Sequence, residues 1–317
     1  MPVNLKDLKN RIKSVKNTQQ ITKAMKLVSA AKFGRAQHAV LAARPYAKAL
    51  GGVVGSVLGA SGSSEIKHNL LNQSDSKRIL FVIVSSERGL CGGFNSNVAK
   101  FALKEISEAA AVGAIPTVVC IGKKAYQLLV RKREQMGLKA GTGSLKLEDW
   151  ETLEDDTGIL DKLNLLQTPF DKPGIQLTNR LANVIRAAFE KGTFGEIRFV
   201  YNKFQSVVAQ VPTLKTVLPL TDTPVAGGSV ESAGNSLFEP DPVSLLDSIL
   251  PRYFLGSVYQ LFLESSASEH GARMTAMDAA TRNAKQMERK LQITYQRARQ
   301  AAITTELIEI ISGAEAL

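Results

Sequence analysis

The sequence predicts an α/β fold with long helices, in which an antiparallel coiled coil of the N- and C-terminal helices carries an inserted Rossmann-like α/β domain. Two observations lead to this prediction. Apolar residues recur at helical spacing over both ends of the chain, and strand-length apolar runs alternate with helical patterns in its middle. The predicted domains are an N-terminal coiled-coil helix, the α/β domain and a C-terminal coiled-coil helix, at residues 1–60, 76–221 and 240–317.

The last 75 or so residues read as one helix, which at 1.5 Å per residue would be about 110 Å long. Asp241 is a suitable N-cap and Pro242 suits the first helical position. Charges interrupt every window long enough for a membrane span, so a coiled coil is favoured. Two helices broken near Gly256 or Gly271 remain an alternative. The expected contact positions in the distal half are Ala276, Ala279, Asn283, Met287, Leu291, Thr294, Ala298, Ala301, Thr305 and Ile308.

The first block, residues 4 to about 58, also reads as one long helix. Its first 50 residues hold eleven Lys or Arg and a single acid, Asp7. Such a face favours an acidic protein groove as its partner, and a basic coiled-coil nucleic-acid-binding protein is the alternative. The expected contact positions include Leu5, Leu8, Ile12, Val15, Thr18, Ile21, Met25 and Val28.

The middle of the chain predicts a small parallel α/β domain. Strands are expected at 79–84 and 116–121, each followed by a helix, at about 96–111 and 123–133. A helix at 175–191 and a hairpin of strands 196–204 and 207–219 complete the domain. The stretch from 136 to 171 has no clear pattern.

No motif predicts a cofactor or a metal. The glycine-rich loop at 86–95 lacks the glycine spacing of a dinucleotide fingerprint and the Gly-Lys-Ser/Thr of a phosphate loop, so a tight turn is the better explanation. The acidic run at 148–156 lacks the alternation of a calcium loop. Cys91 and Cys120 are expected to be buried free thiols of a reducing compartment.

Composition describes a soluble, strongly basic protein. The net charge is +11 and the sequence pI is about 9.6, which indicates an acidic partner without saying which kind. The amino terminus has no apolar core or cleavage site, so no signal peptide is expected.

Four motifs in order resemble the gamma subunit of the F-type ATP synthases. They are IKSVKNTQQITKAM at 12–25 followed by LVSAAK at 27–32, SSERGLCGGFN at 85–95, ASEHGARM at 267–274, and ARQAAITTELIEIISGA at 298–314. The resemblance spans almost the whole chain, and the last motif is the most specific. The stretch 138–174 does not follow the family clearly, and no cysteine-containing regulatory insert is present.

The resemblance implies a non-catalytic central stalk that rotates inside a hexamer of alpha and beta subunits and couples proton flow to ATP synthesis. It implies further partners, namely the epsilon subunit and the membrane ring of c subunits, with no nucleic acid, no cofactor and no membrane span of its own. The absent presequence favours a bacterial protein, bound peripherally at the cytoplasmic face of the inner membrane.

Partner-contact residues are carried over from the family's motifs by their positions in this sequence. Lys23, Met25 and Lys26 match the place where the first helix passes an acidic segment of beta. Glu269 and Arg273 match positions linked to coupling, with a salt bridge inside the coiled coil as an equal alternative. The polar contacts expected near the carboxyl end, against the catch loop and the neighbouring head surface, are Arg299, Gln300, Thr304 and Glu306.

Overall fold

In the computed structural model the two ends of the chain form single long helices, α1 (Leu5–Ala60) and α7 (Pro242–Glu315). The structure describes residues 4–60, 68–72, 76–132, 143–144, 165–168, 174–220 and 241–315. Gly256 and Gly271 lie inside α7, so the prediction of one unbroken final helix is confirmed and the break at either glycine is not observed.

The predicted start of α7 is confirmed in detail. The Ser244 backbone N–H donates to Asp241 Oδ2 over 3.0 Å, and the Leu245 N–H donates to the Asp241 carbonyl over 3.1 Å. The bond from Ser244 satisfies one of the amide groups that a helix start leaves without an intrahelical partner, and the bond from Leu245 is the first bond of the helix itself. The bond from Ser244 also lowers the pKa of the Asp241 carboxyl, because it stabilises the ionised form.

The chain divides into two compact units, which are described separately. The paired-helix unit comprises residues 1–31 and 273–317, and the sheet unit comprises residues 32–272. The predicted domain limits, 1–60, 76–221 and 240–317, divide the chain by its order of helices and strands. The two compact units divide it by contacts in space, so the predicted limits stay a prediction.

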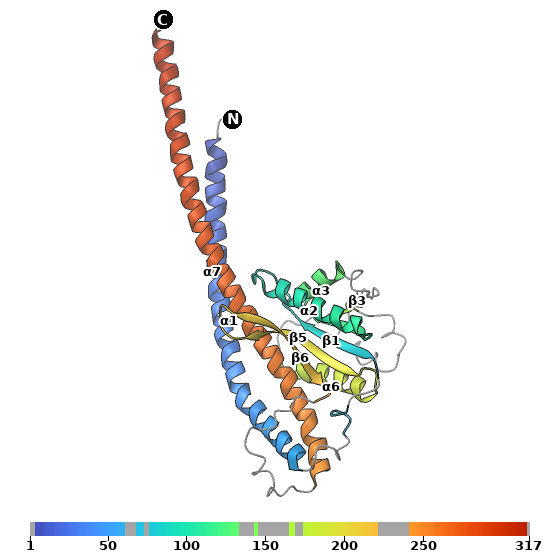
Figure 1. Ribbon diagram of the computed structural model, residues 1–317. Helices are drawn as coiled ribbons and strands as arrows, with labels where there is room; N and C mark the ends of the chain where they lie inside the picture. Colours follow the sequence, from blue (N-terminus) through green and yellow to red (C-terminus); the bar gives the residue numbers. More distant parts are fainter. Residues whose placement is uncertain are drawn as a thin grey trace. The chain divides into compact units, whose positions relative to one another are not determined.

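The sheet unit contains a six-stranded sheet in the order β3-β4-β2-β1-β5-β6. All neighbours run parallel except β5 and β6, which form an antiparallel hairpin (Figure 1). The strands are β1 (Arg78–Val84), β2 (Ile115–Ile121), β3 (Gly143–Ser144), β4 (Leu165–Thr168), β5 (Glu196–Phe204) and β6 (Gln210–Leu218). The helices between them are α2 (Phe94–Ala111), α3 (Lys123–Val130) and α6 (Ile175–Glu190).

The parallel α/β prediction is confirmed, with two differences. The hairpin turn is longer than the two residues expected, because Ser206 N–H donates to the Ala209 carbonyl and β6 starts only at Gln210. Strands β3 and β4 fall in the stretch without a sequence pattern and were not predicted. Both are short, and β4 joins the sheet beside β2. The acidic run at 148–156 lies outside the described residues.

Successive side chains of β1 point to opposite faces of the sheet, so the core of this unit has two layers. Leu80, Val82 and Val84 face a cluster that includes α6 and the first part of α7. Residues 79, 81 and 83 of β1 face the other cluster, which α2 and α3 cover (Figure 1). A strand buried on both faces reads as a continuous apolar run, which is what the sequence shows.

The glycine-rich loop after β1 is held by its own side chains. Ser86 N–H donates to Asn95 Oδ1 over 3.1 Å, and Asn95 Nδ2 lies 3.1 Å from Cys91 Sγ. Leu90 and Gly92 adopt positive φ, 64° and 58°. The tight-turn interpretation is therefore confirmed, although one of the two left-handed positions is a leucine and not a glycine.

In the paired-helix unit Lys26 contacts Asp278, whereas Thr22, which comes earlier in α1, contacts Thr281, which comes later in α7. The two helices therefore run antiparallel (Figure 1). The least exposed positions follow a heptad pattern of alternating three- and four-residue steps, which is the signature of a coiled coil. These positions, here called the seam, are residues 5, 8, 12, 15, 19, 22, 26 and 29 of α1 and residues 277, 281, 284, 288, 291, 295, 298 and 302 of α7.

The seam corrects part of the sequence prediction. Thr18, Ile21 and Val28 were expected in contact positions of α1 but are exposed, and the seam passes through Gln19, Thr22, Lys26 and Ser29. On α7 the exposed members of the predicted set are Asn283, Met287, Thr294, Ala301, Thr305 and Ile308, and the seam lies one residue later at 284, 288, 295 and 302. The prediction followed apolar side chains, whereas the helices pack along a 3.5-residue repeat that also takes in polar ones.

Candidate interaction surface on the terminal helices

The first group of predicted contact residues divides into inward and outward side chains. Lys23 is exposed, Met25 is half-buried and Lys26 turns toward α7. The Lys26 Nζ lies 2.5 Å from Asp278 Oδ1, and Asp278 Oδ2 lies 2.8 Å from Arg282. A hydrogen bond from Lys26, together with the charge of Arg282, lowers the pKa of the Asp278 carboxyl. Lys26 is thus engaged within the unit, whereas Lys23 is open to a partner.

The second predicted pair does not lie on open surface. Arg273, at the start of the paired-helix unit's part of α7, is 9% exposed. Glu269 belongs to the sheet unit and is half-buried. A buried arginine costs desolvation unless it is bonded inside the fold. This burial favours the alternative of an internal role for Arg273 over a direct contact with another subunit.

The third group lies on the surface near the end of α7. Arg299, Gln300, Thr304 and Glu306 are all exposed. The Thr304 hydroxyl donates to the Gln300 carbonyl over 2.9 Å, which occupies its proton within the helix. The guanidinium of Arg299 and the carboxylate of Glu306 therefore offer the charged groups of this surface, one of each sign.

Sequence reasoning missed how apolar this end is toward solvent. Ile310 is 72% exposed, and none of the apolar side chains around it is buried. After Arg299 the helix carries only acids among its charged residues. Large apolar side chains exposed over three turns mark an interaction surface. The exposed apolar residues at this end are Ile303, Leu307, Ile308, Ile310 and Ile311. The sequence could have indicated them, because its apolar residues there fall on all sides of the helix.

A smaller apolar area lies on α1. Ile21, Leu27 and Val28 are about 60% exposed, and Lys23 lies on the same stretch of helix. Apolar side chains next to an unpaired basic one suit a partner that offers both an apolar surface and a carboxylate. Only the basic component of this surface was expected from the sequence.

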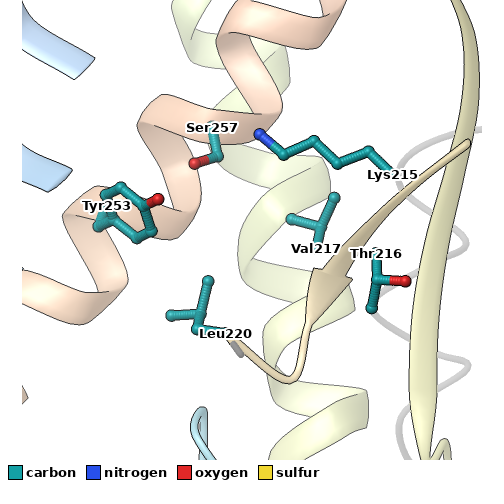
Figure 2. Close-up of a pocket in the computed structure, with 6 residues that line it drawn as sticks. All are labelled: Lys215, Thr216, Val217, Leu220, Tyr253 and Ser257. Atoms are coloured by element: carbon teal, nitrogen blue, oxygen red, sulfur yellow. The ribbon is translucent and has the colours of Figure 1, made fainter. Parts of the chain in front are cut away.

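A small hollow lies between β6 and α7 in the sheet unit. Figure 2 shows Lys215, Thr216 and Val217 of β6 on one side, with Tyr253 and Ser257 of α7 opposite. The space open to the centre of a water molecule is about 10 Å³. This volume is close to the minimum for a single water, so the hollow does not hold a nucleotide.

The two cysteines of the sheet unit are both buried. Cys91 and Cys120 are thiols outside any disulfide, as expected, and burial raises the pKa of the Cys120 thiol. Among the residues that the structure describes, no three His, Cys, Asp or Glu side chains come together as metal ligands would. None of the helices in the described ranges combines the length and the hydropathy needed to cross a bilayer.

Comparisons with known proteins agree over nearly the full length. The family model described as ATP synthase matches residues 4–317. The chain is 40% identical to an ATP synthase gamma chain of Sinorhizobium fredii over 99% of both sequences. It is 42% identical to those of Geobacter sp. and Paracoccus denitrificans, again over 99% of each. These comparisons give no support to the alternative of a nucleic-acid-binding protein.

Solved structures share the fold at lower identity. A chain of the Euglena gracilis mitochondrial ATP synthase matches with a TM-score of 0.59 and 16% identity, over 98% of this chain and 94% of that one. A chain of the Tetrahymena thermophila central stalk and c-ring structure matches with a TM-score of 0.55 and 20% identity, over 82% of this chain and 99% of that one. The family model and the curated relatives together establish that this chain belongs to the ATP synthase family, beside the gamma chains.

Proposed function

We propose that the chain is the central rotating stalk subunit of a proton-translocating F-type ATP synthase. It would couple proton flow through the membrane sector to ATP synthesis at catalytic sites on the beta subunits. The observation that carries the proposal is the pair of long terminal helices. They pack against each other along the seam, and the carboxyl end of α7 exposes apolar and charged side chains. The gamma-chain relatives over 99% of the sequence support it.

The proposal assigns no bond chemistry to the chain itself. As a subunit it belongs to an ATPase complex, but its part would be mechanical, with catalysis confined to the beta subunits. The pocket between β6 and α7 is too small for a nucleotide, and the groups of the glycine-rich loop are bonded to one another. These two observations agree with a mechanical part for the described residues of the sheet unit.

Specific partners follow from the exposed groups. The apolar end of α7 suits an apolar sleeve formed by the alpha and beta subunits, because such a lining covers Ile310 and its neighbours without fixing one orientation. The basic first helix suits an acidic segment of beta. The epsilon subunit and the c-subunit ring are further proposed partners, at the inner membrane of a bacterium.

Reconstitution tests this function. Purified alpha and beta subunits are combined with the full chain, and ATP hydrolysis is compared with that of alpha and beta alone. We expect the chain to assemble with them and to raise hydrolysis. A chain that folds but neither assembles nor changes the rate would contradict the proposal.

The Arg299→Ala variant tests the charged contact near the end of α7. Arg299 is exposed and lies outside the seam, so its removal leaves the isolated fold intact. We expect weaker assembly or lower coupling of hydrolysis to proton transport in the reconstituted complex. Lys285→Ala is a matched control, because it removes an exposed cation farther from the apolar end. Equal behaviour of both variants and the wild type would argue against a role for Arg299.

A further inference from the structure

Four polar side chains meet across the seam of the paired-helix unit. Thr22 and Lys26 come from α1, and Asp278 and Thr281 come from α7. The hydroxyl oxygens of Thr281 and Thr22 lie 2.9 Å apart, and each also lies within hydrogen-bond distance of a carbonyl of its own helix, at 2.7 Å from Met277 and 3.0 Å from Gln19. Lys26 Nζ donates to Asp278 Oδ1 over 2.5 Å. Thr22 is 9% exposed, so the threonine contact is largely shielded from water.

The ion pair is supported from its own helix. Arg282 lies one turn after Asp278 on α7 and contacts its second oxygen at 2.8 Å. The Asp278 carboxylate therefore bonds to two cations, one on each helix. The side chains of Lys26 and Asp278 are 41% and 28% exposed, and exposed ion pairs stabilise a fold only modestly. The cluster is thus better suited to choosing one arrangement than to adding stability.

In the part of α1 around Thr22 and Lys26, polar side chains face α7 and apolar ones face solvent, which is the reverse of the usual arrangement. Seam positions 19, 22, 26 and 29 are Gln, Thr, Lys and Ser, whereas Ile21 and Val28 are exposed. Rotating α1 by about one residue, or 100°, would bury Ile21 and Val28, but it would also expose the apolar seam residues at 8, 12 and 15. Between residues 19 and 29 hydrophobic burial therefore does not select the observed face of α1, and the cross-helix polar contacts are what distinguish it there.

We propose that Thr22, Lys26, Asp278 and Thr281 form a register clamp, which fixes the rotation and the axial alignment of α1 against α7. Single polar residues in a coiled-coil seam are known to specify alignment in this way. A shift of one heptad toward the carboxyl end of α7 would place Lys26 beside Lys285 and Thr22 beside Glu288, so the sequence also disfavours this alternative alignment.

The clamp gives Lys26 a role different from that of Lys23. Lys23 is exposed and available to a partner, whereas Lys26 is committed to Asp278. This inference does not rest on the proposed function, because it concerns only how two helices of one chain align.

Distance measurement between the two helices tests the clamp in the full chain. Spin labels are attached to cysteines introduced at Lys9 and Arg289, which are both exposed, while Cys91 and Cys120 are buried and remain unlabelled. Pulsed electron resonance then gives the distribution of distances between the labels. A one-heptad slip moves the labels by about 10 Å along the axis, which the method resolves.

The decisive variants reverse the charges of the clamp. We expect Lys26→Asp to broaden or shift the distance distribution, because it places a second acid against Asp278. The full reversal, K26D with D278K and R282E, restores an attractive set and is expected to return the distribution toward that of the wild type. Thr22→Val, which removes the hydroxyl at nearly constant shape, is expected to broaden the distribution without altering charge.

Lys16→Asp is the matched control, because it reverses an exposed charge outside the seam of the same helix. Its distribution should equal that of the wild type. The clamp is refuted if K26D and T22V both leave the distribution unchanged, or if the full reversal is no closer to the wild type than K26D alone. Should K26D fail to fold, T22V decides by the same measurement.

Discussion

The core of the sheet unit and the seam of the paired-helix unit are built on different principles. Strand β1 sends Leu80, Val82 and Val84 to one apolar cluster and its alternate residues to another, and all are buried. The seam instead alternates apolar side chains such as Leu8 with threonine, glutamine and a lysine ion pair. The sheet unit thus gains stability from burial, whereas the paired helices leave apolar side chains such as Ile21 and Val28 exposed.

The largest effect is expected in the sheet core. Phe199 of β5 is fully buried, and its ring meets Phe262 edge to face at 6.2 Å between centroids. Phe199→Ala should lower the free energy of unfolding by about 3–5 kcal/mol, from lost burial and a residual cavity. Urea unfolding followed by circular dichroism measures it. Val208→Ala in the exposed hairpin turn is the control, and an equal effect of both variants would show that burial of the side chain is not the source of the loss.

A backbone position in the same unit comes next. Gly122, after β2, has φ of 97°, and a Cβ there would lie 2.3 Å from the Ser85 carbonyl oxygen. Gly122→Ala should therefore cost about 3 kcal/mol from strain and overlap. Gly34→Ala, in α1 with nothing within 4 Å of its added Cβ, should instead stabilise the chain slightly through helix propensity. Thermal unfolding of the two variants should shift in opposite directions, and shifts of the same sign would contradict this account.

Within the paired-helix unit, inward and outward apolar residues should differ. Leu8 is 6% exposed and Ile21 is 60% exposed. Leu8→Ala should destabilise the chain by about 2 kcal/mol, the lower end for a buried leucine, because the seam is shallow. Ile21→Ala should stay within about 0.5 kcal/mol in the isolated chain. Chemical unfolding of both variants checks this, and a larger loss for Ile21→Ala would mean that the seam passes elsewhere.

The smallest effect concerns the start of α7. Asp241 caps the helix through Ser244, and its folded pKa is lowered below the ordinary value of 3.8. A carboxyl with a lowered folded pKa stabilises the fold above its unfolded pKa and loses this contribution as pH falls through its folded pKa. Asp241→Ala should therefore lower the melting temperature at neutral pH, and the deficit should shrink below about pH 4. A deficit independent of pH would show that the ionised cap is not its cause.

The two units also differ in how far sequence could predict them. Apolar runs such as 79–84 predicted β1 within one residue, because a doubly buried strand allows few polar side chains. Strands β3 and β4 carry no such signal and exist through pairing with a neighbour. The motif at the end of the chain identified the exposed surface at 299–306, although whether those side chains contact partners stays a prediction.

The helix pairing was predicted only in outline. Direction and length were correct, but the seam was placed on Ile21 and Val28, which are exposed. A sequence pattern cannot separate apolar side chains that face a helix of the same chain from those that await another subunit. The burial of Leu8 and the cross-helix contacts of Thr22 and Lys26 show which face is internal.

The proposed rotor function is tested by observing whether the chain rotates inside the assembled complex. The complex of alpha, beta and this chain is fixed to a surface through the alpha and beta subunits. A bead is then attached to a cysteine introduced at Val112, which is 89% exposed in the sheet unit, since both native cysteines are buried. We predict that ATP drives rotation of the bead in one direction. A complex that hydrolyses ATP while the bead stays still would contradict it.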